Sequence, residues 1–144
     1  MHLAFNMATA REWIEGRLAP LLLRGLGPRW FAKLGAAHVA KRLGRERADW
    51  LIGLLADQDR KLMVTAWKET MAFDSRRRSR EITCPTLIIA GSADRPVPSH
   101  HANMLQDGIT DSRLVVINGA DHMLLWTHSG ELVRVTEEFL VDSP

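Results

Sequence analysis

The 144-residue chain has one cysteine, no long apolar run and no basic region that leads into an apolar stretch near its first residue. A single cysteine, Cys84, excludes an internal disulfide and suits a reducing compartment, so we expect a cytoplasmic protein. No apolar run approaches the roughly 20 residues that a membrane helix needs. The opening residues, Met-His-Leu-Ala-Phe-Asn-Met, lack the pattern of a secretory signal. We therefore expect a globular protein with neither a membrane span nor a leader.

Acidic residues are scarce in the first part of the chain, and basic residues are scarce in the second. Residues 1–80 contain 16 Lys/Arg and 8 Asp/Glu, whereas residues 81–144 contain 3 and 9. The densest basic cluster lies at 76–80, where nucleic-acid binding is one interpretation. The other interpretation is a solvated helical face that complements an acidic partner surface. We prefer the second and expect no nucleic-acid partner.

Roughly the first 75 residues are predicted to form an all-helical block. Apolar residues recur there at steps of three and four, the spacing of one helix face; in the first helix they are Trp13, Ile14, Leu18, Leu21 and Leu22. Breaks are expected at 25–28, at Gly44 and at 57–60. Four of the five tryptophans fall in this block. They indicate either an aromatic-lined pocket for an apolar substrate or ordinary helix packing, and we favour packing for any single tryptophan.

The pattern changes after a polar, arginine-rich link at 74–80. Residues 86–90 and 113–117 are apolar runs of strand length that do not alternate with polar residues, as is typical of parallel strands covered on both faces. A helix is predicted between them from about 100 to 106, with Ser99 as its cap. An apolar loop is expected at 123–128, and a last amphipathic helix at 130–140. The residues expected to face inward on that helix are Leu132, Val133, Val135, Phe139 and Leu140.

One titratable residue follows each predicted strand. Asp94 follows the first strand through a Gly-Ser-Ala turn, and His122 follows the second through Asn-Gly-Ala-Asp. Reactive groups of parallel sheets gather at the carboxyl ends of the strands, and neighbouring strands lie about 5 Å apart. The two side chains are therefore expected to meet, with the carboxylate holding the imidazole as a general base. Asp94 and His122 are the candidate catalytic residues.

The remaining candidates are weaker. Cys84 precedes its strand, at the wrong end for a nucleophile, and is expected to be a small buried filler. His100 and His101 are adjacent, so their side chains should diverge on a helix, and His122 with His128 has no recognised metal-ligand spacing. We expect neither a metal nor a cofactor.

Residues 82–140 resemble the C-terminal part of the α/β-hydrolase superfamily. The resemblance is carried by Cys-Pro-Thr-Leu-Ile-Ile-Ala-Gly-Ser-Ala-Asp at 84–94 with Val-Pro at 97–98, by Leu-Val-Val-Ile-Asn-Gly-Ala-Asp-His at 114–122, and by the helix ending at Leu140. It implies an α/β fold in partial form: a helical cap at 11–80, then the last two or three parallel strands with flanking helices at 81–144. Residues 1–10 would be the remnant of a core strand. It also implies that Asp94 holds the position of the family's acid and His122 that of its base.

The family's nucleophile lies in a Gly-x-Ser-x-Gly elbow, and no such motif occurs in residues 1–144. Gly91-Ser92 lacks the second glycine, and Ser129-Gly130 follows the histidine, which contradicts the order of the triad. The resemblance implies hydrolysis of an ester or a similar small, apolar acyl substrate. We expect this chain to be a truncated form, inactive or nearly so by itself, because its acid and base have no nucleophile to activate.

A non-catalytic assembly or dimerisation module is the alternative function. Two or three strands bury little surface and leave an open edge at 86–90, where a sheet should continue. We therefore expect a homo-oligomer, or binding to a complementing half, through that edge.

Overall fold

A computed structural model describes residues 9–142, and the predicted strand remnant at 1–10 lies largely outside the described residues. The chain divides between Asp74 and Ser75 into two compact units. The first unit is helical, and the second has helices packed on a parallel pair of strands. Among the described residues, no helix is both long and apolar enough to cross a membrane.

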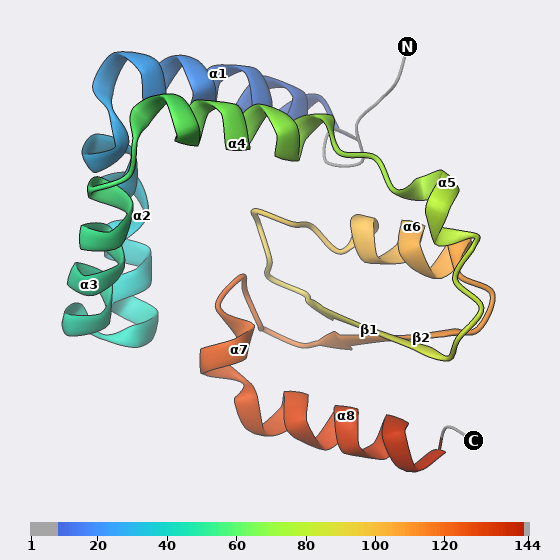
Figure 1. Ribbon diagram of the computed structural model, residues 1–144. Helices are drawn as coiled ribbons and strands as arrows, with labels where there is room; N and C mark the ends of the chain where they lie inside the picture. The colour runs from blue at the N-terminus through green and yellow to red at the C-terminus, as the bar shows by residue number, and fades with distance from the viewer. Residues whose placement is uncertain (1–8, 143–144) are drawn as a thin grey trace. The chain divides into compact units, whose positions relative to one another are not determined.

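The described residues of the first unit, 9–74, form four helices in two packed pairs. They are α1 (Ala10–Leu26), α2 (Pro28–Leu43), α3 (Arg45–Ala56) and α4 (Arg60–Ala72). Helix α1 runs beside α4, and α2 beside α3 (Figure 1). Gly27 and Gly44 adopt φ angles of 83° and 87°, which favour glycine, and end α1 and α2 respectively. The breaks predicted at these two glycines are therefore confirmed.

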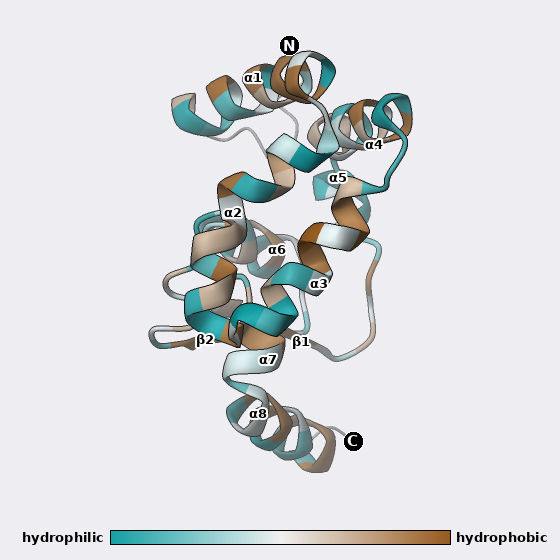
Figure 2. Cartoon of the chain, turned by 90° about the vertical axis from the view of Figure 1, so that its left-hand side faces the viewer, coloured by the Kyte–Doolittle hydropathy of each residue, from teal (hydrophilic) through white to brown (hydrophobic). Residues whose placement is uncertain are grey.

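Apolar residues recur along α1 between polar ones (Figure 2). Several of the residues that the spacing of three and four assigned to one apolar face are nevertheless exposed. Trp13 and Leu21 are 46% and 64% exposed, whereas Leu23 is fully buried. At the other end of the helix, the Arg60 guanidinium donates a 3.0 Å hydrogen bond to the Arg24 carbonyl. This contact ties the start of α4 to the end of α1.

The second unit places two strands between helices. Its elements are α5 (Arg76–Ser79), β1 (Thr86–Gly91), α6 (His100–Gly108), β2 (Ser112–Ile117), α7 (Leu124–Thr127) and α8 (Ser129–Asp142). Strands β1 and β2 pair in parallel, from Thr86 opposite Ser112 to Gly91 opposite Ile117. Helix α6 packs on one face of the pair and α8 lies on the other (Figure 1). The predicted strand–helix–strand order is confirmed.

The core of this unit lies between α6 and the strands. Ile88 of β1, Ala102 of α6 and Ile109 form its buried centre. On α8, Val135 is 3% exposed and faces inward as predicted. The expectation for Val133 and Leu140 was wrong, because they are 50% and 67% exposed. Two strands are too narrow to cover every apolar position of a 14-residue helix.

Two further differences from the prediction concern short helices. The polar link at 74–80 contains α5, and the apolar segment at 123–128, expected to be a loop, contains the single turn α7.

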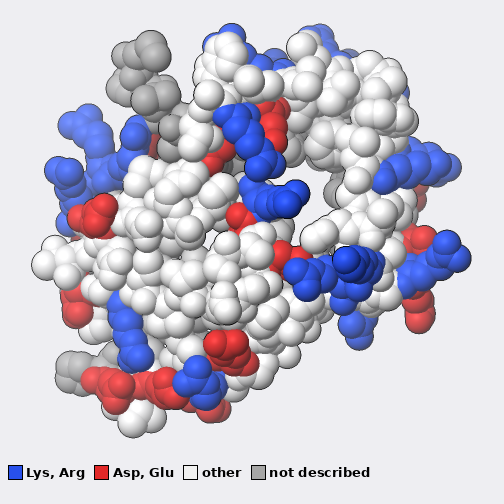
Figure 3. Space-filling model, turned by 180° about the vertical axis from the view of Figure 1, so that it is seen from behind, with Lys and Arg blue, Asp and Glu red and all other residues white. Residues whose placement is uncertain are grey.

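Lys and Arg side chains gather over α5, and acidic side chains over α8 (Figure 3). The charge asymmetry of the sequence therefore appears within the second unit itself.

Candidate active site

Both strands of the second unit end at the same edge of the sheet, and a loop leaves each. The acid loop (residues 92–98) follows β1, and the base loop (residues 118–123) follows β2. Because Gly91 is opposite Ile117 in the parallel register, the two loops start side by side. Asp94 and His122 are therefore carried to the same place by the last residues of neighbouring strands.

Main-chain hydrogen bonds join the acid loop to the last residue of β2 and to the base loop. The Ser92 amide donates to the Ile117 carbonyl at 3.0 Å, and the Ala93 amide donates to the Ala120 carbonyl at 2.8 Å. Gly91 is packed so closely that a Cβ there would collide with the Ala120 carbonyl oxygen. Ala120 itself is fully buried. The loops are thus held in contact by backbone atoms, and the close approach requires glycine at 91.

Asp94 is fixed at both carboxylate oxygens. Its Oδ2 lies 3.0 Å from the Nδ1 of His122, and its Oδ1 accepts a 2.8 Å hydrogen bond from the Val97 amide. The side chain is 8% exposed. The hydrogen bond from the Val97 amide to Oδ1 fixes the rotation of the carboxylate, and in this rotation Oδ2 faces His122. Asp94 is therefore preset to receive a proton donor from the base loop.

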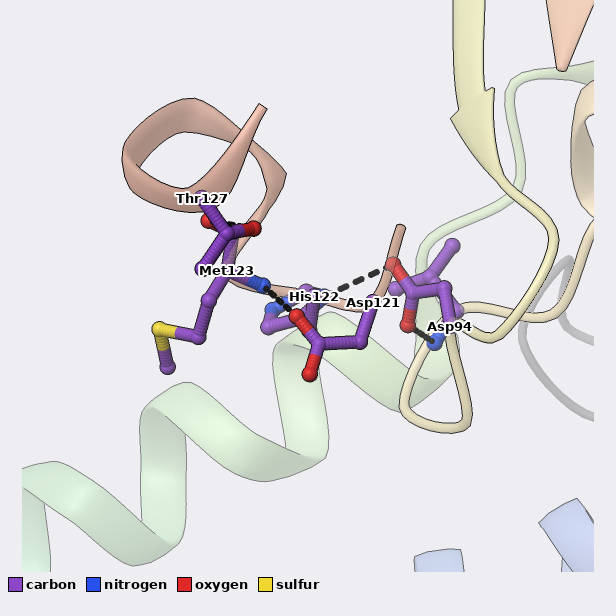
Figure 4. A network of polar contacts seen from close by, with 6 residues as sticks. Asp94, Asp121, His122, Met123 and Thr127 are labelled. Atoms are coloured by element: carbon purple, nitrogen blue, oxygen red, sulfur yellow. Dashed lines mark hydrogen bonds and ion pairs between the residues drawn. The ribbon is translucent and has the colours of Figure 1, made fainter. Parts of the chain in front are cut away.

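His122 turns one ring nitrogen to this carboxylate and leaves the other edge of the ring accessible. Figure 4 shows the two side chains pointing toward each other. The His122 side chain is 52% exposed. A carboxylate accepts and does not donate, so in the neutral ring Nδ1 carries the proton and Nε2 has the free lone pair. This arrangement makes Nε2 the atom that can take a proton from a substrate or a nucleophile.

Asp121 anchors the far side of the base loop, which sequence reasoning did not foresee. It is 4% exposed, and its Oδ1 accepts a 3.0 Å hydrogen bond from the Met123 amide. The Met123 carbonyl in turn accepts from the Thr127 hydroxyl at 3.1 Å (Figure 4). Asp121 thus starts the turn of α7 directly after the histidine. An aspartate two residues ahead of an apolar run is the sequence signal that could have shown this.

Two of the weaker candidates differ from their predictions. Cys84 is exposed, so its expected role as a buried filler is wrong. Among the described residues, no strand lies opposite the segment that precedes β1, where Cys84 is located. The rings of His100 and His101 do not diverge, because their centroids lie 4.2 Å apart. His128 is close to Thr127 instead, with 2.8 Å between its Nδ1 and the Thr127 hydroxyl.

A family model described as "alpha/beta hydrolase fold" matches residues 7–129, most of the chain. Among curated proteins, the chain is 32% identical over 106 residues to RutD of Azorhizobium caulinodans, which carries the name of a carbamate hydrolase; the match covers 74% of this chain and 36% of RutD. It is 39% identical over 67 residues to 2-hydroxy-6-oxononadienedioate/2-hydroxy-6-oxononatrienedioate hydrolase 2 of Pseudomonas putida, covering 46% of this chain and 23% of the relative.

Solved structures show the same fold. The enol-lactonase of Burkholderia xenovorans LB400 superimposes with a TM-score of 0.76 at 18% identity, covering 96% of this chain and 54% of the lactonase. The bromoperoxidase of Bacillus anthracis superimposes with a TM-score of 0.75 at 21% identity, covering 96% and 51%. The chain thus spans about a third of RutD and about half of these solved chains. By its family-model match and its fold, this chain belongs to the alpha/beta hydrolase fold family.

Proposed function

We propose that this chain supplies the acid and the base of a serine-type hydrolase, with Asp94 and His122 in those roles. The observation that carries the proposal is the 3.0 Å contact between Asp94 Oδ2 and His122 Nδ1, with the histidine side chain half exposed. The proposed substrate is an ester or a similar small, apolar acyl compound. The names of the relatives support hydrolysis in general, and each describes only that relative.

In the proposed reaction His122 carries two protons in turn, one in each half of the reaction. Its Nε2 lone pair takes the proton of the nucleophile's hydroxyl as the oxygen bonds to the acyl carbon and the carbonyl electrons move onto the carbonyl oxygen. Asp94 stabilises the resulting imidazolium through Nδ1–H without taking its proton. When the tetrahedral intermediate collapses, Nε2–H protonates the departing alkoxide. Water then replaces the alcohol, and the same two transfers release the acid and restore the nucleophile.

We further propose that the nucleophile and the oxyanion donors come from outside these 144 residues. No Gly-x-Ser-x-Gly occurs in the sequence, and the solved relatives contain about as much chain again as this one matches. In this proposal residues 11–80 are the cap, residues 81–144 are the C-terminal part of the core, and residues 1–10 are the remnant of a core strand. An exposed Cys84 thiol fits a reducing, cytoplasmic setting.

The chain by itself is expected to hydrolyse p-nitrophenyl esters no faster than buffer, because His122 has no hydroxyl to activate. The assay compares initial rates of the wild type and of His122→Ala at equal concentration. Enzyme-like turnover that disappears in His122→Ala would show that a nucleophile is present within these residues, and the proposal of an external one would be wrong.

The open edge of β1 is the proposed docking site for the nucleophile-bearing half. Within the described residues β1 pairs only with β2, and it contains no charged residue from Thr86 to Gly91. By contrast, β2 carries Arg113, whose guanidinium lies 3.6 Å from the Asp142 carboxylate, and a charged residue discourages further pairing on a strand. A strand of the other half would therefore add beside β1.

Without that half, the chain is expected to associate with itself through β1. Light scattering over a range of concentrations should then show an average mass above that of the 16.2 kDa monomer. Hydrogen exchange should slow in residues 86–91 as the mass rises and should not change in residues 112–117. A monodisperse monomer that unfolds cooperatively at every concentration would contradict this expectation.

A further inference from the structure

We propose that Ser92 is a positioning residue, whose hydroxyl holds the base loop against the acid loop so that His122 meets Asp94. The hydroxyl oxygen accepts a 2.8 Å hydrogen bond from the Gly119 amide. The same hydroxyl donates a hydrogen bond to the Oδ1 of Asn118, with 3.4 Å between the two oxygens. One side chain in the acid loop thus contacts two consecutive residues of the base loop.

The hydrogen bonds of the Ser92 hydroxyl lie close in sequence to both Asp94 and His122, so they can affect how these two side chains are oriented. Ser92 is two residues before Asp94, and Gly119 is three residues before His122. Gly119 adopts a φ of 72°, so the base loop turns sharply there. This is the residue whose amide donates to the Ser92 hydroxyl. The link therefore fixes the direction in which the base loop leaves β2.

The Ser92 hydroxyl supplies the side-chain hydrogen bonds between the acid loop and the base loop, and main-chain hydrogen bonds add to them. The Ser92 and Ala93 amides also bind the base-loop side through main-chain carbonyls, and these bonds do not depend on the side chain. Loss of the hydroxyl should therefore leave the strands in register while freeing residues 118 and 119. The expected effect is a looser His122 in a folded protein.

The significance of this inference rests on the proposed function, but its test does not require hydrolysis. Nitrogen-15 NMR of the histidine side chains, at a pH where the rings are neutral, reports which nitrogen of His122 carries the proton; His122→Gln assigns its signals. In the wild type the Nδ1–H tautomer should predominate, because Asp94 accepts from it. In Ser92→Ala the ratio of the Nε2–H to the Nδ1–H tautomer should rise roughly threefold to tenfold, the equivalent of one ordinary hydrogen bond.

Ser112 offers a matched control at the opposite end of β2. Its hydroxyl donates a 2.8 Å hydrogen bond to the Ile109 carbonyl, whereas the Ser92 hydroxyl accepts from a backbone amide. Ser112→Ala therefore also removes a serine hydroxyl that is hydrogen-bonded to the backbone. This variant should leave the tautomer ratio of His122 unchanged. Ser92→Thr keeps a hydroxyl at the same atom position and should restore the wild-type ratio. If Ser92→Ala does not fold, Asn118→Ala, which removes only the weaker contact, should raise the ratio by a smaller factor.

An unchanged tautomer ratio in folded Ser92→Ala, or an equal change in Ser112→Ala, would overturn the role of Ser92 and leave the proposed function standing. A wild-type ring without the Nδ1–H tautomer would overturn both. If the tautomer and its dependence on Ser92 are found but no nucleophile-bearing half yields hydrolysis, only the proposed function is wrong.

Discussion

Replacing His122 with alanine should lower kcat/KM for a p-nitrophenyl ester by about 10⁴-fold to 10⁶-fold in a completed enzyme. Completion here means fusing this chain behind the part of Azorhizobium caulinodans RutD that precedes its match. The loss is large because Nε2 of His122 moves the proton in both halves of the proposed reaction. Steady-state rates of the two fusions measure it directly.

Asp94→Asn should cost about 10⁴-fold in the same fusion, for a reason specific to this site. Oδ1 of residue 94 accepts from the Val97 amide, so an asparagine that keeps this bond turns its NH₂ group toward Nδ1 of His122. Nδ1 then becomes an acceptor, the ring proton moves to Nε2, and the lone pair needed by the nucleophile is lost.

Two controls separate this loss from general damage to the loops. His128→Ala removes a histidine whose Nδ1 is hydrogen-bonded to Thr127, and Asp111→Asn changes an exposed aspartate beside β2. Both should retain wild-type rates. Rates in His122→Ala or Asp94→Asn equal to those of the controls would show that the pair takes no part in the reaction.

Gly91→Ala should destabilise the second unit by about 2–3 kcal/mol, the upper range for forcing one methyl group into a packed site. The new Cβ would collide with the carbonyl oxygen of Ala120. A backbone carbonyl cannot rotate away as a long side chain can, and this one also accepts from the Ala93 amide. Relief therefore requires the two loops to separate, which should also break the contact between Asp94 and His122.

Gly130→Ala is the matched control for this substitution. A Cβ at Gly130 meets no atom within 4 Å, and the residue lies in α8. Alanine should therefore be neutral or stabilising there. Denaturant unfolding of both variants measures the difference in the free energy of unfolding. Equal stabilities would mean that the loops can part at position 91 without cost, contrary to the close contact described.

The parts of the fold that sequence predicted are those with local signals. Apolar runs bounded by small turn residues located both strands, and the parallel order predicted that the side chains of Asp94 and His122 would meet. Their 3.0 Å contact confirms that expectation, while their catalytic roles stay a prediction. Likewise, the break at 25–28 followed from two glycines and Pro28, and the break at Gly44 from glycine; Gly27 and Gly44 have positive φ angles there.

The parts that sequence did not predict depend on contacts between distant residues. The Ser92 hydroxyl meets Gly119 only because two loops 27 residues apart leave neighbouring strands in one register. The burial of helix residues depends on how much sheet lies beneath them, so Val133 was expected inside and is exposed. Similarly, α7 follows a turn in which the Asp121 carboxylate accepts from the Met123 amide, and apolar periodicity does not reveal that contact.

Labelling by a fluorophosphonate probe, which reacts only with an activated serine, tests the central claim most directly. In the RutD fusion we expect a serine outside residues 1–144 to be labelled when this chain carries Asp94 and His122, and not when it carries His122→Ala. We also expect no labelling of this chain alone. Equal labelling of the wild-type and His122→Ala fusions would contradict the account, because the serine would then be activated without the pair.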